Sequence, residues 1–158
     1  MSTTKPQVTI IVVPRERFSY TRESLESIYR CNNSYPFDLV YVDGNSPRHI
    51  QNYLAQQAKS KRFKLIRVNN YLSPNQARNI GLQVAETKYV VFMDNDLHVA
   101  PGWLEKLVNC AEEELATVVC PLVRQLSFGG YATWLEKMLV AGERKVNRAI
   151  SDRYHIEH

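Results

Sequence analysis

The chain has 158 residues, which allows one ordinary domain of about 100–200 residues and leaves little room for a second. With 44% hydrophobic and 23% charged residues, and no apolar run near the roughly 20 residues that span a bilayer, the composition excludes a disordered, collagen-like or membrane-spanning chain. The net charge of +4 combines a balance of +5 in residues 1–97 with one of −1 in residues 98–158. That asymmetry favours an anionic ligand in the first part of the chain, but it is too weak to indicate a nucleic-acid partner.

Five short apolar runs rich in β-branched residues are predicted strands, at residues 8–13, 39–42, 63–68, 89–93 and 117–120. The segments between them repeat apolar residues at i, i+3 and i+4, as Leu25, Ile28 and Tyr29 do, which predicts helices. The alternation of strand and helix predicts an α/β fold with a mostly parallel, Rossmann-like sheet and helices on both faces.

Two predicted helices begin with recognisable signals. The segment Ser73-Pro74-Asn75-Gln76 offers a hydroxyl N-cap, a proline at the first helical position and a glutamine three residues after the cap. The segment Pro101-Gly102-Trp103 opens another helix, predicted to run through Ala111.

The C-terminal part departs from this alternation. Residues 131–150 predict an amphipathic helix, with charges of both signs opposite its apolar side. Mixed signs favour packing on the domain, or a homodimer through this helix, over a membrane surface. We therefore expect an α/β domain over residues 1–124 and an extension for packing or oligomerisation over residues 125–158. The apolar side would be formed by Leu135, Met138, Leu139, Val146 and Ile150.

The cysteines and the N-terminal residues bear on the compartment. Cys31, Cys110 and Cys120 are widely spaced and form no CxxC pair, which predicts neither a disulfide scaffold nor a zinc site. Residues 1–7 lack the charged and apolar parts of a signal peptide. A cytoplasmic location is therefore expected.

Charged residues follow three of the predicted strands. The first strand leads into Pro14-Arg15-Glu16, the second into Asp43-Gly44-Asn45-Ser46, and the fourth into Asp94-Asn95-Asp96. Ligands bind at the carboxyl ends of the strands in open parallel sheets. Carboxylates at that edge fit a hard cation such as Mg²⁺ or Mn²⁺ together with phosphate oxygens. A polar turn held by local hydrogen bonds explains Asp-Asn-Asp equally well at this point.

The order of these features carries a resemblance. Residues 71–107 read YLSPNQARNIGLQVAETKYVVFMDNDLHVAPGWLEKL, in which an Ala-Arg-Asn-x-Gly helix precedes an apolar strand that runs into an Asp-x-Asp motif. Together with the loops after the first two strands, this order resembles the nucleotide-sugar-binding part of inverting family 2 glycosyltransferases of the GT-A fold. The resemblance covers roughly residues 7–121.

The resemblance implies donor-binding roles for particular residues. Asp94 and Asp96 match the Asp-x-Asp motif, which holds a divalent metal, Mg²⁺ or Mn²⁺, on the donor diphosphate. Asp94 would also lie near the ribose or sugar. Asp43 matches the acid that contacts the base or ribose. Arg78 matches the arginine of the helix motif, and its planar guanidinium suits a diphosphate or sugar hydroxyls.

The loop after the first strand departs from the pattern. Pro14, Arg15 and Glu16 occupy the loop that lines the nucleoside pocket, where the family more often has a small hydroxyl residue and an aromatic one. A Rossmann dehydrogenase and a sugar-nucleotide pyrophosphorylase are both disfavoured, because each needs a glycine-rich loop at this place.

The activity implied is metal-dependent transfer of a sugar from a UDP- or GDP-sugar to an acceptor hydroxyl, with inversion. The family's general base lies well downstream of the Asp-x-Asp motif, and the residues after Asp96 show no match to that segment. The base and the acceptor are therefore not predicted. A catalytically silent GT-A-like binding or assembly domain is the alternative.

Overall fold

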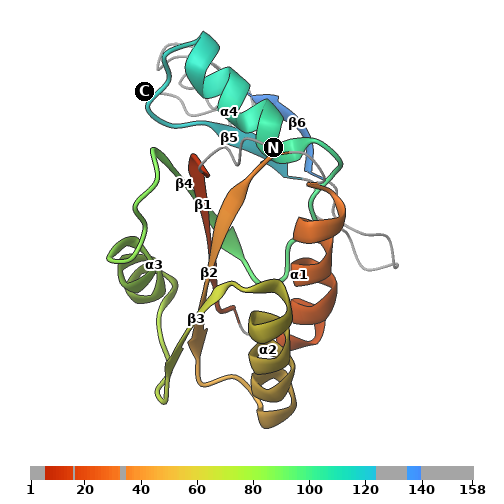
Figure 1. Cartoon of the computed structure of the whole chain (residues 1–158), viewed down its shortest axis with the longest axis vertical. Helices are drawn as coiled ribbons and strands as arrows, with labels where there is room; N and C mark the ends of the chain where they lie inside the picture. Colours follow the sequence, from red (N-terminus) through yellow and green to blue (C-terminus); the bar gives the residue numbers. More distant parts are fainter. Residues whose placement is uncertain (1–5, 16, 33–34, 124–134, 140–158) are drawn as a thin grey trace, which may run out of the picture. The chain divides into compact units, whose positions relative to one another are not determined.

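A computed structural model describes residues 6–15, 17–32, 35–123 and 135–139 (Figure 1). The elements alternate strictly between strand and helix from β1 to β5, apart from one short 3-10 helix, Phe18–Tyr20, which precedes α1. In chain order they are β1 (Val8–Val13), α1 (Thr21–Arg30), β2 (Phe37–Gly44), α2 (Arg48–Lys61), β3 (Lys64–Val68), α3 (Pro74–Leu82), β4 (Tyr89–Asp94), α4 (Trp103–Glu113), β5 (Cys120–Val123) and β6 (Leu135–Leu139).

The backbone groups into two compact units. The first is formed by residues 1–27 and 34–97, and the second by residues 28–33 and 98–158. Strands β1 to β4 with α2, α3 and most of α1 belong to the first unit, while α4, β5 and β6 belong to the second. The domain boundary predicted at residue 124 remains a prediction.

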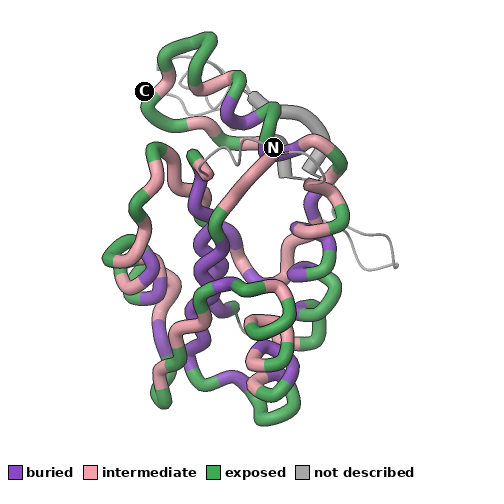
Figure 2. The backbone as a smooth tube through the Cα atoms, viewed as in Figure 1, coloured by how far each residue is buried: buried purple, intermediate pink, exposed green. Residues whose placement is uncertain are grey.

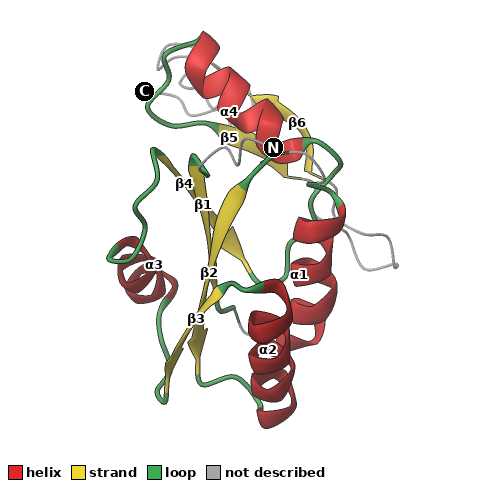
Figure 3. Cartoon of the chain, viewed as in Figure 1, coloured by secondary structure: helices red, strands yellow, loops and turns green. Residues whose placement is uncertain are grey.

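The first unit is built on a four-stranded parallel sheet in the order β3-β2-β1-β4. Helix α3 covers one face of this sheet, and α1 and α2 cover the other (Figure 3). The predicted α/β class, with a parallel sheet and helices on both faces, is confirmed. Because all four strands run the same way, their carboxyl ends share one edge, where Asp43 and Asp94 lie near the ends of β2 and β4.

Strand β1 forms the centre of the core, and all six of its residues are buried (Figure 2). A central parallel strand is covered on both faces, which explains its continuous apolar run. On the α3 side, Ile11 and Val13 pack with Val40, Val42, Leu72 and Ala77. This packing fixes the strands and the helix whose ends carry the polar residues.

The second unit corrects two predictions. The fifth run was expected at residues 117–120, but β5 is Cys120–Val123 and pairs antiparallel with β6 in a separate two-stranded sheet. Residues 135–139, predicted to be helical, form β6 itself. Periodicity in a short apolar segment does not separate helix from strand, and pairing with β5 decides the outcome here. The rest of the predicted helix at 131–150 lies outside the described residues, so a homodimer through it remains a prediction.

Helix α4 begins after Gly102, as predicted from the Pro-Gly-Trp segment. The glycine N-cap has φ +69°, a left-handed conformation that few other residues adopt without strain. Within the described part of the chain, no helix is both long and apolar enough to cross a bilayer.

Candidate functional site

Asn95 anchors the Asp94-Asn95-Asp96 turn at the end of β4. Its side chain is buried, with Oδ1 accepting a hydrogen bond from the backbone N–H of Arg15 at 2.7 Å. Its Nδ2 donates to Oγ1 of Thr21 at 2.9 Å, and its backbone N–H donates to the carbonyl of Val13 at 3.1 Å. The middle residue of the motif therefore ties the turn to the loop after β1 and to the start of α1.

Asp94 lies between two arginines. Its Oδ2 is 3.6 Å from Nε of Arg15, and its Oδ1 is 3.6 Å from Nη2 of Arg78. The side chains are 25%, 52% and 34% exposed for Asp94, Arg15 and Arg78. Burial raises the pKa of Asp94, and the charge of Asp96 adds to this, while Arg15 and Arg78 oppose it. Partial burial thus disfavours the charged form of this carboxylate, and two partly exposed arginines stabilise that form.

Helix α3 sets the position of Arg78. The predicted capping box is confirmed: Oγ of Ser73 accepts from the N–H of Gln76, and the Gln76 side chain accepts from the N–H of Ser73. Nη1 of Arg78 donates to Oδ1 of Asn75 at 3.0 Å, and the guanidinium carbon lies 5.9 Å from the centre of the Phe92 ring. These contacts direct the guanidinium toward the end of β4.

Gly81 allows α3 to approach the sheet. A Cβ at this position would lie 2.4 Å from Cγ2 of Ile11, a distance that real side chains do not tolerate. Ala77, one turn earlier, is fully buried against the same strands. In the Ala-Arg-Asn-x-Gly motif the two small residues therefore bring the helix close, and the arginine between them reaches the edge.

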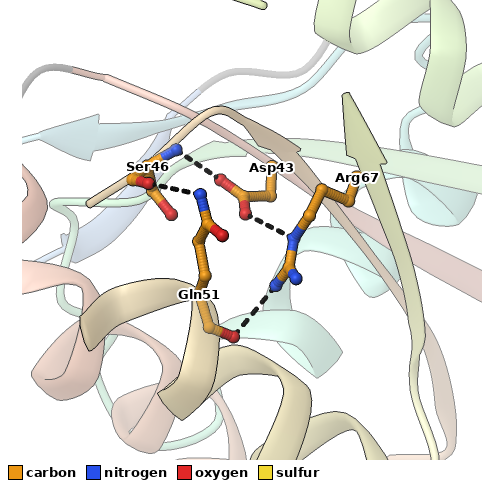
Figure 4. A network of polar contacts seen from close by, with 4 residues as sticks. All are labelled: Asp43, Ser46, Gln51 and Arg67. Carbon is orange, nitrogen blue, oxygen red and sulfur yellow. Dashed lines mark hydrogen bonds and ion pairs between the residues drawn. The ribbon is translucent and has the colours of Figure 1, made fainter. Parts of the chain in front are cut away.

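Asp43 belongs to a closed network at the ends of β2 and β3 (Figure 4). Oδ1 of Asp43 accepts from the N–H of Ser46 at 3.0 Å, and Oδ2 accepts from Nε of Arg67 at 3.2 Å. Nη2 of Arg67 donates to the Gln51 carbonyl at 2.9 Å, and Nε2 of Gln51 donates to the Ser46 carbonyl at 2.7 Å. Asp43 is the predicted site residue, and Arg67 is the partner that the sequence did not reveal.

Only the register of β2 and β3 indicates that Arg67 is the partner of Asp43. Asp43 and Arg67 are directly paired residues of the parallel strands β2 and β3, so their side chains lie on the same face. Both are the next-to-last residue of their strand. An alignment of the two strand ends would have placed this arginine opposite the aspartate.

The structure brings some predicted site residues together and leaves others apart. Arg15, Arg78, Asp94 and Asp96 gather at the ends of β1 and β4, whereas Asp43 lies in the network at β2 and β3. Pro14 is buried, and Arg15 is exposed beside it. Glu16 lies outside the described residues.

The fit of a divalent cation rests on Asp94 and Asp96. Among the described residues, no group of three or more His, Cys, Asp or Glu side chains is placed to hold a metal. Oδ1 of Asp94 is nevertheless buried and has no hydrogen-bond partner in that part of the chain, since 3.6 Å to Arg78 is too long for one. Mg²⁺ commonly takes one or two carboxylates and completes its shell with phosphate oxygens and water. The two carboxylates fit that pattern, with a diphosphate supplying the remaining ligands.

The family model described as "Glycosyl transferase family 2" matches residues 9–156. The chain belongs to this family. An uncharacterized glycosyltransferase of Haemophilus influenzae is 32% identical over 106 residues, which cover 66% of this chain and 42% of that protein. The chain spans less than half the length of curated relatives that it matches, between 12% and 42% for eight of them.

Two solved structures share the fold. TarS of S. aureus (residues 1–349), crystallised with UDP, superposes with a TM-score of 0.59 at 22% identity, over 69% of this chain and 33% of that one. The mannosyltransferase PcManGT of Pyrobaculum calidifontis, in complex with GDP-Man and Mn²⁺, gives 0.58 at 24% identity, over 74% and 34%. The fold expected from the resemblance, a GT-A-type sheet, is confirmed, and a role in glycosyl transfer is supported.

Proposed function

We propose that this chain forms the donor-binding part of a metal-dependent, inverting glycosyltransferase that uses a UDP- or GDP-sugar. The observation that carries the proposal is the carboxylate of Asp94 between Arg15 and Arg78, at the edge where parallel sheets bind ligands. The nucleotides and the Mn²⁺ named for the two similar structures agree with this ligand class.

In this proposal the arginines bind the diphosphate. The side chains of Arg15 and Arg78 are 52% and 34% exposed, and each guanidinium has a nitrogen 3.6 Å from Asp94. A guanidinium is always charged and presents donors in a planar fork that matches phosphate oxygens. Arg15 belongs to the loop in which the family named above more often has a small hydroxyl residue and an aromatic one, and it would add a second fixed cation to the diphosphate site.

Asp94 and Asp96 would hold the divalent cation beside the diphosphate. When bound, such a cation stabilises the negative charge that develops on the departing phosphate. The residues of the chain hold the leaving group in place: Arg15 and Arg78 bind its oxygens, and Asn95 keeps the turn fixed through its bonds to Arg15 and Thr21. Preorganised charges of this kind act without reorganising during the reaction.

The nucleoside end would lie at β2 and β3, with Asp43 in its wall. Asp43 lies on β2, which is next to β1 on the side away from β4, and Arg15 lies in the loop after β1. Neighbouring strands are about 4.8 Å apart, so the β2 and β4 ends are separated by about 10 Å. An extended nucleoside diphosphate can therefore run along the edge, with its base toward β2 and β3 and its phosphates toward β1 and β4.

Calorimetric titration of the intact chain with UDP, GDP and their sugars, with and without Mn²⁺, tests the proposal. We expect micromolar to millimolar binding that requires Mn²⁺ and is lost in Asp96→Ala. Asp38→Asn is the matched control, because Asp38 is an exposed acid at the opposite end of β2. If neither nucleotide binds, or if Asp96→Ala binds as wild type does, the proposal is wrong.

A transfer assay separates an active enzyme from a silent domain. Release of UDP or GDP from the sugar nucleotide, with water or an added sugar as acceptor, should depend on Asp94 and Asp96. Binding without any release, under conditions where a longer relative turns over, would favour the catalytically silent alternative.

A further inference from the structure

We propose that Arg67 is the residue that contacts the donor nucleobase, and that Asp43 serves to position it. This inference rests on the proposed function, because it assigns a role within the same donor site. It reverses the order expected from the sequence, in which Asp43 itself makes the contact.

Accessibility separates the two residues. The side chain of Asp43 is 1% exposed, whereas that of Arg67 is 34% exposed. Both carboxylate oxygens of Asp43 already accept hydrogen bonds, from Ser46 and from Arg67. A ligand reaches Asp43 only if the groups that cover it move, whereas a third of the Arg67 side chain is open to solvent.

The guanidinium of Arg67 is held in one orientation. Nε donates to Asp43 at 3.2 Å, and Nη2 donates to the Gln51 carbonyl at 2.9 Å (Figure 4). Two bonds at different nitrogens fix a planar group both in position and in rotation. Ser46 closes the ring by joining Asp43 and Gln51. A long side chain that would otherwise lose much freedom on binding is therefore already ordered.

One nitrogen of Arg67 is left for a ligand. Nη1 has no hydrogen bond or ion pair with any described residue of the chain, and it carries two N–H groups. Such donors pair with a carbonyl oxygen. Uracil and guanine have carbonyl oxygens on the ring, whereas adenine has none. Adenine offers only ring nitrogens as acceptors and carries an amino group where guanine and uracil carry a carbonyl, so we expect Arg67 to favour a base with a carbonyl group, as in a UDP- or GDP-linked donor.

Strand order places Arg67 at the base end of the ligand. It is the next-to-last residue of β3, the strand farthest from β4 in the sheet. Three strand spacings, about 14 Å, separate β3 from the strand that ends in Asp94. Arg67 is thus remote from the proposed diphosphate site, where Arg15 and Arg78 already supply the cations.

Four variants of the intact chain test the assignment: Arg67→Lys, Arg67→Gln, Asp43→Asn and the double variant Asp43→Asn/Arg67→Gln. Calorimetry with Mn²⁺ would give the affinity of each for UDP and for inorganic pyrophosphate. Lysine keeps the charge beside Asp43, so Arg67→Lys should fold, but its donors all start from one nitrogen, whereas Arg67 bonds Asp43 and Gln51 from two nitrogens and has a third for a ligand. Lys64→Gln is the control, since Lys64 lies on the same strand and contacts none of the network residues among those described.

We expect Arg67→Lys and Arg67→Gln to weaken UDP about 10- to 100-fold, the effect of one charge-assisted hydrogen bond. Pyrophosphate affinity should be unchanged, and so should both affinities in Lys64→Gln. Asp43→Asn should weaken UDP less than Arg67→Gln does, and the double variant should match Arg67→Gln. Selectivity for UDP over ADP should fall when Arg67 is replaced.

Three results would overturn the inference. If Asp43→Asn loses as much as the double variant while Arg67→Lys binds normally, Asp43 is the contact. If Arg67→Lys weakens pyrophosphate as much as UDP, Arg67 serves the diphosphate. If all variants bind UDP as wild type does, the network is structural only. Absence of nucleotide binding by the wild-type chain would instead refute the proposed function itself.

Discussion

Replacing Gly81 with alanine tests whether close packing of α3 on β1 is required by the fold that positions Arg78. The added Cβ would lie 2.4 Å from Cγ2 and 3.2 Å from Cδ1 of Ile11. Heavy atoms do not approach so closely, so either the helix or the strand must shift. Ile11 is fully buried in the central strand, where it packs with Val13 and Ala77, and it has little space to move.

Two effects set the size of the change. Overpacking a well-filled core costs about 1–3 kcal/mol. Alanine is favoured over glycine inside a helix by about 1 kcal/mol, which offsets part of that cost. A contact as short as 2.4 Å places the overpacking cost near the upper end of that range, at about 2–3 kcal/mol, so we expect Gly81→Ala to lower the free energy of unfolding by about 1–2 kcal/mol. At about 2–4 °C for each kcal/mol in a chain of this size, the melting temperature should fall by about 2–8 °C.

Urea unfolding followed by circular dichroism measures the effect. Asn79→Ala is the matched control, because Asn79 lies on the exposed side of the same helix and its replacement changes helix propensity without approaching β1. The control should be neutral or slightly more stable than wild type. If Gly81→Ala is as stable as wild type, then the glycine is not required by packing and our account of the motif is wrong.

Three further predictions concern the turn at Asp94. Because burial raises the pKa of Asp94 above 3.8, the folded chain binds this proton more tightly than the unfolded chain does, and stability falls as the pH rises through the window between the two pKa values. Asp94→Asn should therefore be more stable than wild type at about pH 7.5, with the difference shrinking as the pH falls and largely gone by about pH 3.5, and urea unfolding at both pH values checks this. Asn95→Ala leaves the Arg15 amide and the Thr21 hydroxyl without their bonds of 2.7 and 2.9 Å, so it should lose about 2 kcal/mol in the same assay. UDP and Mn²⁺ should tighten each other's binding by the same factor, measured by titrating each in the presence of the other.

Each of these has a clear contrary result. An Asp94→Asn variant that is less stable than wild type at neutral pH would mean that the ion pairs with Arg15 and Arg78 outweigh burial. An Asn95→Ala variant of unchanged stability would show that water replaces the lost bonds. Independent binding of UDP and Mn²⁺ would place the metal away from the diphosphate.

Local signals account for the parts of the fold that the sequence predicted best. The residues Val8–Val13, five of them apolar, are β1 with the predicted bounds, because a central parallel strand is buried on both faces. The helix after Ser73 begins where the capping residues predicted it, because its first turn satisfies its own backbone groups. Both signals lie within a few residues of the feature that they specify.

Features that depend on distant pairing were not predicted. The partner of Asp43 is Arg67, 24 residues later, and only the register of β2 and β3 brings them together. Asn95 lies between two aspartates in the sequence, yet its side-chain partners come from the loop after β1 and from α1, 80 and 74 residues away. Residues 135–139 have a pattern compatible with a helix, and pairing with β5 makes them a strand. In each case the deciding interaction is made with a segment far away in the sequence, which the local pattern of apolar residues does not reveal.

The pairing of charges along the sheet edge gives a physical reason for joint binding of metal and diphosphate in the proposed site. In the described chain Asp94 already has two cations at 3.6 Å, so the local charges are largely balanced without a ligand. A diphosphate alone would bring its negative charge up to Asp94, and a cation alone would face Arg15 and Arg78. When both bind, the diphosphate pairs with the arginines and the cation pairs with the carboxylate, so no charge is left beside its like. Arg15 strengthens this requirement, because it is the second of the two positive charges that lie beside Asp94.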